Sequence, residues 1–279
     1  MPVDKVTQKG GDTSEAAPLE RRPILELRGI SKRFGAVEAL SEVDFEVFPG
    51  EVVALVGDNG AGKSTLIKCV AGTHAFDSGQ IVFEGNRVHI HGPKVAARLG
   101  IEVVYQDLAL CDNLDVVQNM YLGREISRAQ ILSEAPMEHH TSETLKSLAV
   151  TSIKSVRQTV ATLSGGQRQS VAVARAVMWN SKLVILDEPT AALGVAQTEQ
   201  VLELVRRLGQ QGIGVILISH NLHDVFETAD RITVLRLGRT VGVFDRRSTT
   251  QQAVVEAITA GMPTKVAGIP STPGAGAGT

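Results

Sequence analysis

Residues 57–65 read GDNGAGKST, and this stretch restricts the possible folds of the chain more than any other. The mostly apolar residues 51–56 predict a buried strand before it, and a helix is predicted from about residue 63 to residue 71. A glycine-rich turn between a strand and a helix lets backbone N–H groups close around an anion, and the helix N-terminus adds partial positive charge. The stretch therefore predicts a phosphate-binding loop within an α/β fold.

The same stretch carries side chains suited to a nucleotide and its metal ion. Lys63 can reach the β- and γ-phosphates, the Ser64 hydroxyl can hold Mg²⁺, and Thr65 can donate to an inner phosphate. The predicted nucleotide-binding residues of the loop are Gly57, Asn59, Gly60, Ala61, Gly62, Lys63, Ser64 and Thr65.

Strands and helices alternate along the rest of the chain, which predicts a parallel α/β core. Residues 91–180 are predicted to be mainly helical, as an insert within that core. The predicted strands are 80–83, 87–90, 182–186, 214–219, 231–235 and 240–244, and the later helices are 198–210 and 222–229.

Composition excludes several classes of protein. Of the 279 residues, 28 are Lys or Arg and 30 are Asp or Glu, so the net charge of −2 gives no electrostatic signal for nucleic acid. Two cysteines argue against a disulfide framework and indicate a reducing compartment. No apolar run approaches the roughly 18 residues of a membrane span, and the polar N-terminus lacks a signal core. We expect the chain to reach a membrane only through a partner.

Acidic and polar residues follow three predicted strands. Residues 183–190 read LVILDEPT, so Asp187 is placed to face Mg²⁺ and Glu188 to polarise an attacking water. Gln106 and His220 follow two other apolar runs; alone, each would most simply be a surface cap. Beside the phosphate loop and LDEP, both are predicted to sense the γ-phosphate, with Gln106 also a metal ligand.

Residues 163–167 read LSGGQ before a helix-forming run, a second turn built to hold an anion. Together with GDNGAGKST, Gln106, LVILDEPT and His220, this motif resembles those of the ATP-binding-cassette ATPases, over roughly residues 24–262. The resemblance implies ATP, Mg²⁺ and a P-loop cassette with a mostly parallel core sheet, an antiparallel β subdomain and a helical subdomain. It places the cassette at 23–262, its helical subdomain at about 107–178, and disordered tails at 1–22 and 263–279.

The resemblance also implies that the second turn serves another molecule. In the family, LSGGQ closes over ATP held by a second cassette, so a homodimer is expected. The residues predicted to contact the partner's nucleotide are Ser164, Gly165, Gly166 and Gln167. By the same resemblance Phe34 stacks on adenine, and residues 107–122 contact membrane permease subunits. In one departure, Gly194 occupies the place of an aspartate that helps to organise the dimer.

The finer likeness is to single-cassette monosaccharide importers, on the segments VVYQDLAL, NMYLGREI and ISHNLHDVFETADRITVLRLGRTVG. It implies a motor subunit peripheral on the cytoplasmic side of the cell membrane, coupling ATP hydrolysis to sugar uptake through a permease and, indirectly, a sugar-binding protein. The main alternative is an importer of a non-sugar solute. A cassette acting on DNA or ribosomes, a separate-subunit exporter and an inactive adaptor are weaker alternatives.

Overall fold

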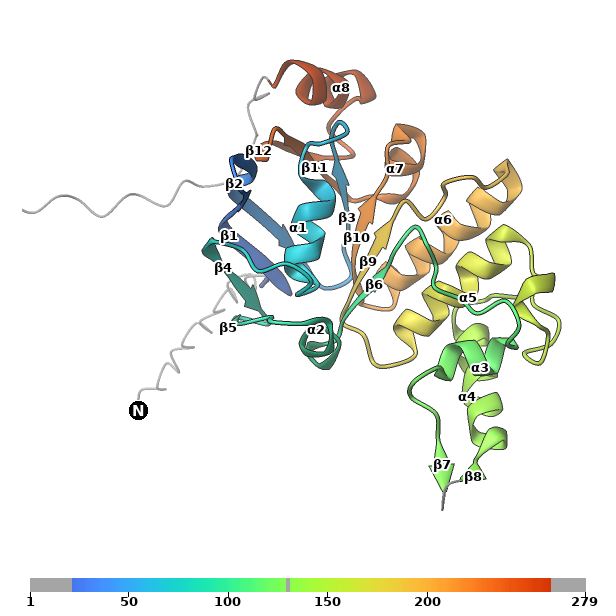
Figure 1. The fold of residues 1–279 in the computed structure, drawn as a ribbon. Helices are drawn as coiled ribbons and strands as arrows, with labels where there is room; N and C mark the ends of the chain where they lie inside the picture. The colour runs from blue at the N-terminus through green and yellow to red at the C-terminus, as the bar shows by residue number, and fades with distance from the viewer. Residues whose placement is uncertain (1–21, 129–130, 262–279) are drawn as a thin grey trace, which may run out of the picture.

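The computed structural model describes residues 22–128 and 131–261. Apart from Arg22, the tails predicted at residues 1–22 and 263–279 lie outside the described residues. The centre of the molecule is a six-stranded sheet (Figure 1). Across this sheet the strands are β12 (Arg239–Asp245), β11 (Arg231–Arg236), β3 (Val52–Val56), β10 (Gly214–Ile218), β9 (Leu183–Asp187) and β6 (Ile101–Val104).

All neighbouring strands of this sheet run parallel except β11 and β12, which are antiparallel. Side chains of β3 alternate between two hydrophobic clusters, with Val52 and Ala54 in one and Val53 and Leu55 in the other. Both faces of the sheet are thus covered, which explains why its strands read as continuous apolar runs. Because parallel strands end at one edge, the residues following β3, β6, β9 and β10 meet there.

A four-stranded antiparallel sheet covers one face, with strands in the order β2 (Val37–Val47), β1 (Leu25–Phe34), β4 (Ser78–Phe83) and β5 (Asn86–Val88). Its apolar side chains pack in one cluster with those of helix α1 (Lys63–Val70) and with alternate residues of β3. Figure 1 shows this sheet beside α1, on the opposite side of the molecule from α3, α4 and α5. The predicted α/β class, with its parallel core and antiparallel sheet, is confirmed.

Helices cover the other side. They are α3 (Val116–Tyr121), α4 (Glu134–Ser147), a 3₁₀ turn (Val160–Thr162), α5 (Gly165–Val177) and α6 (Val195–Gln210). A short hairpin of β7 (Ser127–Arg128) and β8 (Ile131–Leu132) joins α3 to α4. The remaining helices are α2 (Pro93–Leu99), α7 (Leu222–Thr228) and α8 (Gln251–Ala260). No helix within 22–128 and 131–261 is both long and apolar enough to cross a membrane.

Two parts of the sequence reading need correction. Residues 101–104 form strand β6 beside β9, so the strand end expected before Gln106 is present, although the description of 91–180 as mainly helical gave this strand no bounds. Only four residues long, β6 is too short for its period to stand out from a helical pattern. No helix is predicted after residue 244, whereas α8 packs against β11 and β12 through Val254 and Ala257.

Candidate functional site

The phosphate loop has the backbone that its sequence predicts. It connects β3, whose five residues are all buried, to α1. Gly57, Gly60 and Gly62 have φ values of 151°, 81° and 104°, which disfavour any residue with a Cβ. A Cβ on Gly57 would lie 2.1 Å from the Leu235 carbonyl oxygen, and one on Gly62 would lie 2.7 Å from that of Ala39. Backbone conformation therefore favours glycine at all three positions, and lack of space also requires it at Gly57 and Gly62.

The loop forms one wall of a cavity of about 300 Å³. Asp187 and Glu188, from the end of β9, line the same cavity, as do Val37, Glu38 and Ala39 of β2, which we call its rim. The loop residues that line the cavity are Asn59, Gly60, Ala61, Gly62, Lys63, Ser64 and Thr65. The sequence analysis missed the three β2 residues, because their place beside the loop comes from packing between the two sheets.

Lys63 lies where the loop and the acidic strand end meet. Its Nζ donates to the carbonyl oxygens of Gly57, at 2.6 Å, and Asp58, at 3.0 Å. Burial lowers the pKa of Lys63, while the negative charges of Glu188, Asp58 and Asp187 act in the opposite direction. The ammonium is thus partly desolvated, and three nearby carboxylates favour its charged form.

Asp187 and Glu188 are adjacent in sequence but differ in surroundings. Asp187 is the last residue of β9, and burial, followed by the charge of Glu188, raises its pKa. Glu188 leaves the strand with φ of 52°, a left-handed conformation costing about 1–3 kcal/mol in a non-glycine residue. Its backbone N–H donates to the Ile218 carbonyl oxygen at 2.9 Å, which attaches this turn to the end of β10.

The turn brings Glu188 to His220. Glu188 Oε2 lies 2.7 Å from His220 Nδ1, with the glutamate side chain 17% exposed and the histidine 74% exposed. This hydrogen bond leaves Nε2 of the imidazole ring for another partner. The structure thus brings together two predicted residues that are 32 positions apart in the chain.

Behind this pair lies a residue that the sequence analysis missed. Asp224, 4% exposed, accepts from Thr190 Oγ1 at 2.6 Å and from Asn221 Nδ2 at 2.9 Å. It therefore links the turn that follows Glu188 to the residue that follows His220. The sequence offered only a weak signal, a first-turn acid in the predicted helix 222–229, and nothing in it revealed that this acid is buried.

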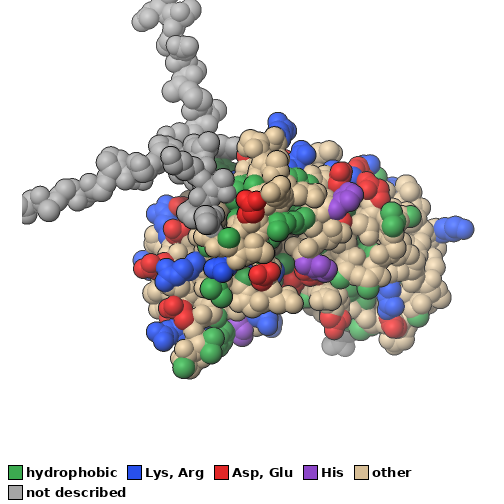
Figure 2. All heavy atoms as spheres, turned by 90° about the horizontal axis from the view of Figure 1, so that it is seen from above, with side chains coloured by type: hydrophobic (Ala, Val, Ile, Leu, Met, Phe, Trp, Pro, Cys, Tyr) green, Lys and Arg blue, Asp and Glu red, His purple; other side chains and the backbone are tan. Residues whose placement is uncertain are grey.

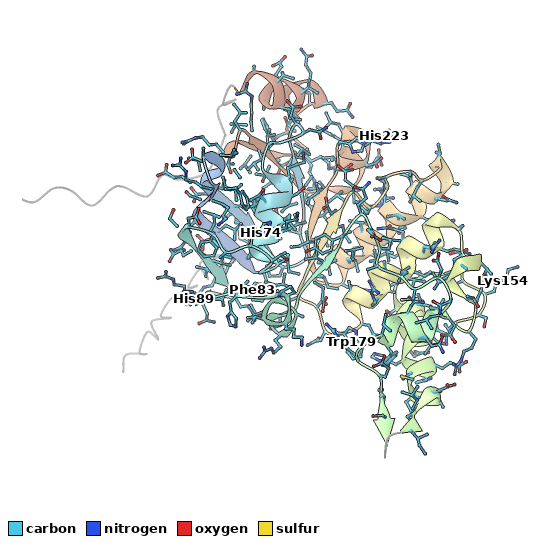
Figure 3. The ribbon with its side chains drawn as sticks, viewed as in Figure 1. His74, Phe83, His89, Lys154, Trp179 and His223 are labelled. Atoms are coloured by element: carbon cyan, nitrogen blue, oxygen red, sulfur yellow. The ribbon has the colours of Figure 1, made fainter. Side chains whose placement is uncertain are left out.

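The remaining predicted residues lie farther from the cavity lining. Gln106 is exposed beyond the end of β6 and does not line the cavity. Phe34 ends β1, is 45% exposed, and pairs in register with the rim residue Val37. Its ring meets His74 edge-on at 5.3 Å between centroids, and Lys32 Nζ lies 5.3 Å from its centre. His74 follows α1 in the middle of the view in Figure 3. The contacts with His74 and Lys32 therefore hold the Phe34 ring beside the rim of the cavity.

LSGGQ takes no part in lining this cavity. Ser164 is the N-cap of α5, and it forms a reciprocal capping box with Gln167. The Gln167 Nε2 amide also donates to the Ser152 carbonyl oxygen at 2.6 Å. Ser164 and Gly165 are exposed, whereas Gly166 is buried against Gln197. The exposed positions of the motif are thus its serine and the first of its two glycines.

Gly194 lies beside this motif as the N-cap residue of α6. It provides no side-chain cap, and its φ of −73° suits any residue. A Cβ added to it would meet nothing within 4 Å. Packing therefore does not require glycine at the position where the family resemblance leads one to expect aspartate.

Comparisons with known proteins agree on the family. Residues 40–191 match the family model described as ABC transporter. The chain is 46% identical to a fructose import ATP-binding protein of Rhizobium meliloti, covering 86% of this chain and 95% of that protein. It is also 46% identical to a xylose/arabinose import ATP-binding protein of Sulfolobus acidocaldarius, covering 85% and 94%.

Longer relatives and solved structures extend the comparison. A ribose import ATP-binding protein of Rubrobacter xylanophilus is 45% identical, and the match covers 79% of this chain but only 44% of that protein. Among structures, an ATP-binding cassette of an ABC transporter in its ADP conformation is 26% identical with a TM-score of 0.73, covering 85% of this chain and 95% of that one.

Proposed function

This chain belongs to the ABC transporter family, and from that premise we propose that it is the ATP-hydrolysing motor subunit of a sugar importer. The observation that carries the proposal is the cavity of about 300 Å³ in which the phosphate loop faces Asp187 and Glu188. The sugar is proposed because relatives matching nearly their whole length are named for import of fructose and of xylose and arabinose.

In this proposal ATP binds with its phosphates in the loop. Backbone N–H groups of the loop and the N-terminus of α1 bind the phosphate oxygens, and Lys63 neutralises their charge. The adenine lies toward the rim, where Phe34 and Val37 offer apolar surface. Thr65 lines the same cavity and donates to an inner phosphate.

Hydrolysis needs a base that positions water for in-line attack on the γ-phosphate. Glu188 supplies it, because its carboxylate faces the loop across the cavity and its turn is held by Ile218 and, through Thr190, by Asp224. His220 keeps the Glu188 carboxylate in place through Nδ1 and presents Nε2 for a phosphate oxygen.

A Mg²⁺ ion fits the oxygen donors that line the cavity. Ser64 and Asp187 provide one hydroxyl and one carboxylate, and Mg²⁺ in such sites takes its other ligands from phosphates and water. The described residues hold no group of three His, Cys, Asp or Glu side chains able to bind a metal alone, in keeping with a site shared with phosphate. Gln106 would complete the set only after moving toward the cavity. Bound there, Mg²⁺ offsets phosphate charge.

The second half of the mechanism needs a second copy of the chain. Ser164 and Gly165 are exposed outside the cavity of their own chain, so the nucleotide they bind belongs to a partner cassette. Two copies arranged head to tail form two shared sites. ATP stabilises the closed pair, and hydrolysis reopens it.

Closure drives transport through partner proteins. Residues 107–122 are proposed to contact the permease on the cytoplasmic side of the membrane, while a sugar-binding protein delivers the solute. Nucleic acid is not a proposed partner, since Figure 2 shows Lys and Arg interspersed with Asp and Glu on the face it draws, and the net charge is −2.

Two measurements test the proposal. Purified protein should hydrolyse ATP in the presence of Mg²⁺, and Lys63→Ala should abolish nucleotide binding. In the source organism, Lys63→Ala should then abolish uptake of one of labelled fructose, xylose, arabinose or ribose, while uptake of a labelled amino acid is unchanged. Loss of amino-acid uptake alone would favour the alternative, an importer of a non-sugar solute.

A further inference from the structure

Helix α5 begins at LSGGQ and also holds the loop that follows Gln106. Arg175 donates from Nη2 to the Leu108 carbonyl oxygen at 2.8 Å and from Nη1 to that of Ala109 at 3.0 Å. Arg168, two helical turns earlier on the same face, forms an ion pair with Asp112. Both arginines of α5 that face this loop therefore bind residues 107–112.

The far half of the loop is attached to the LSGGQ region by backbone bonds as well. The Ala161 N–H donates to the Asp112 carbonyl oxygen, and the Val160 N–H donates to that of Leu114, each at 3.0 Å. Asn119, fully buried, accepts from the Cys111 N–H at 2.7 Å and donates to the Cys111 carbonyl oxygen at 3.0 Å. Residues 111–114 are thus held to the 3₁₀ turn that precedes LSGGQ and to α3.

The near half, between Gln106 and Ala109, depends on Arg175 for its side-chain hydrogen bonds from α5. Its guanidinium is partly withdrawn from water, and this burial lowers the pKa of Arg175. Hydrogen bonds from a charged donor contribute more to stability than neutral ones do. A desolvated guanidinium also loses much by leaving its two acceptors, so the contact resists separation.

One unbroken helix connects LSGGQ to Arg175. Its 13 residues span about 20 Å, with Ser164 at one end and Arg175 in the last turn. Arg175 and Ala176 also line a cavity of about 180 Å³ bounded by Glu102 and Val103. The sole tryptophan, Trp179, follows the helix and packs against Tyr121 and Arg124 (Figure 3). Displacement at the LSGGQ end is therefore transmitted to the end that holds residues 108–109.

We propose that Arg175 is a positioning residue that makes Gln106 follow the movement of α5. Nucleotide of the partner cassette, bound at Ser164, then sets where Gln106 lies relative to the chain's own nucleotide. The two shared sites are in this way connected through one helix and one arginine. The inference rests on the head-to-tail pairing in the proposed function, and it adds a specific route by which one site affects the other.

Hydrogen exchange of amides, read by mass spectrometry with and without Mg-ATP, tests the inference in a Glu188→Gln background that slows hydrolysis. The Glu188→Gln protein, which is the parent of the other variants, should show at least about fivefold slower amide exchange with ATP in two segments, 163–167 and 106–109. In Arg175→Met, the slowing of exchange by ATP should persist at 163–167, whereas at 106–109 it should fall below twofold. Arg175→Lys, which keeps the positive charge, should restore part of the slowing at 106–109.

Arg168→Met is the matched control, because it removes an arginine from the same face but leaves the backbone bonds at 112–114. It should keep both responses. If Arg175→Met does not fold, Arg175→Gln, which retains a donor but not the charged fork, takes its place.

The outcomes separate the two proposals. An Arg175→Met protein that exchanges faster at 106–109 but keeps its full ATP-dependent difference would show that Arg175 only stabilises the fold. A parent that responds at 163–167 and not at 106–109 would likewise overturn the inference while leaving the pairing intact. A parent with no response at 163–167 would overturn the pairing, and the inference with it.

Discussion

The two glycine-rich turns of the molecule, 57–62 and 164–166, each precede a helix but differ in backbone conformation and in what surrounds them. The first has glycines at positive φ, a lysine and two facing carboxylates within one cavity. In the second, the Gly165 and Gly166 positions lie against Leu193 and Gln197, and the serine caps its own helix. A glycine-rich turn before a helix therefore forms a complete nucleotide site only where other parts of the fold bring charged side chains into the same cavity.

The largest effect is expected from the acidic residues that line the cavity of the first turn. Glu188→Gln removes the proposed base and should lower kcat for ATP hydrolysis by about 10²–10³-fold, while ATP binding persists. Steady-state hydrolysis and equilibrium nucleotide binding measure the two effects. Glu143→Gln, an exposed acid on α4, is the control. Hydrolysis at the rate of the unaltered protein would show that the carboxylate facing the loop is not the base.

The next test compares the glycines directly. Gly57→Ala places a Cβ 2.1 Å from a backbone oxygen at a φ of 151°, so the free energy of unfolding should fall by about 2–4 kcal/mol. Gly165→Ala meets only the flexible end of Leu193, at 2.9 Å, and should cost less than about 1 kcal/mol. Urea denaturation measures both. Equal losses would mean that the two turns are under the same backbone constraint.

A third test separates the two roles of Ser164. Asp is as good an N-cap as Ser, so Ser164→Asp should keep the stability that Ser164→Ala loses, about 1 kcal/mol. Its negative charge would face the phosphates of the partner's ATP, and hydrolysis should fall at least about tenfold. Light scattering in a Glu188→Gln background should show loss of the ATP-dependent pair. Unimpaired pairing and hydrolysis in Ser164→Asp would restrict Ser164 to capping α5.

The smallest effect is expected at Gly194, next to the LSGGQ turn. Gly194→Asp adds a side-chain cap to α6 in open space, so the free energy of unfolding should rise by a few tenths of a kcal/mol, or about 1 °C in Tm. Differential scanning calorimetry measures this change. A fall in Tm would show that the turn before α6 excludes a carboxylate.

Prediction from sequence succeeded where a property belongs to neighbouring residues. The start of α1 at Lys63 and the strands near 183 and 214 follow from apolar runs and glycine-rich turns. It was incomplete for strand β6, because a strand end was expected before Gln106 but the bounds of these four residues depend on pairing with β9. Contact of Gln167 with a partner's nucleotide, implied by the family resemblance, stays a prediction; within the chain its amide oxygen accepts from the Ser164 N–H and its Nε2 donates to the Ser152 carbonyl oxygen.

The sequence by itself determined the phosphate loop, the acidic strand end and the second turn, because their chemistry depends on adjacent residues and on backbone conformations that only glycine favours. Tertiary structure alone decided that Glu188 meets His220, that Asp224 is buried behind them, and that Arg175 binds carbonyl oxygens 66 and 67 positions away. Such contacts depend on which strand ends and helix faces packing brings together. A pattern of neighbouring residues in the sequence does not indicate which distant residues will come into contact.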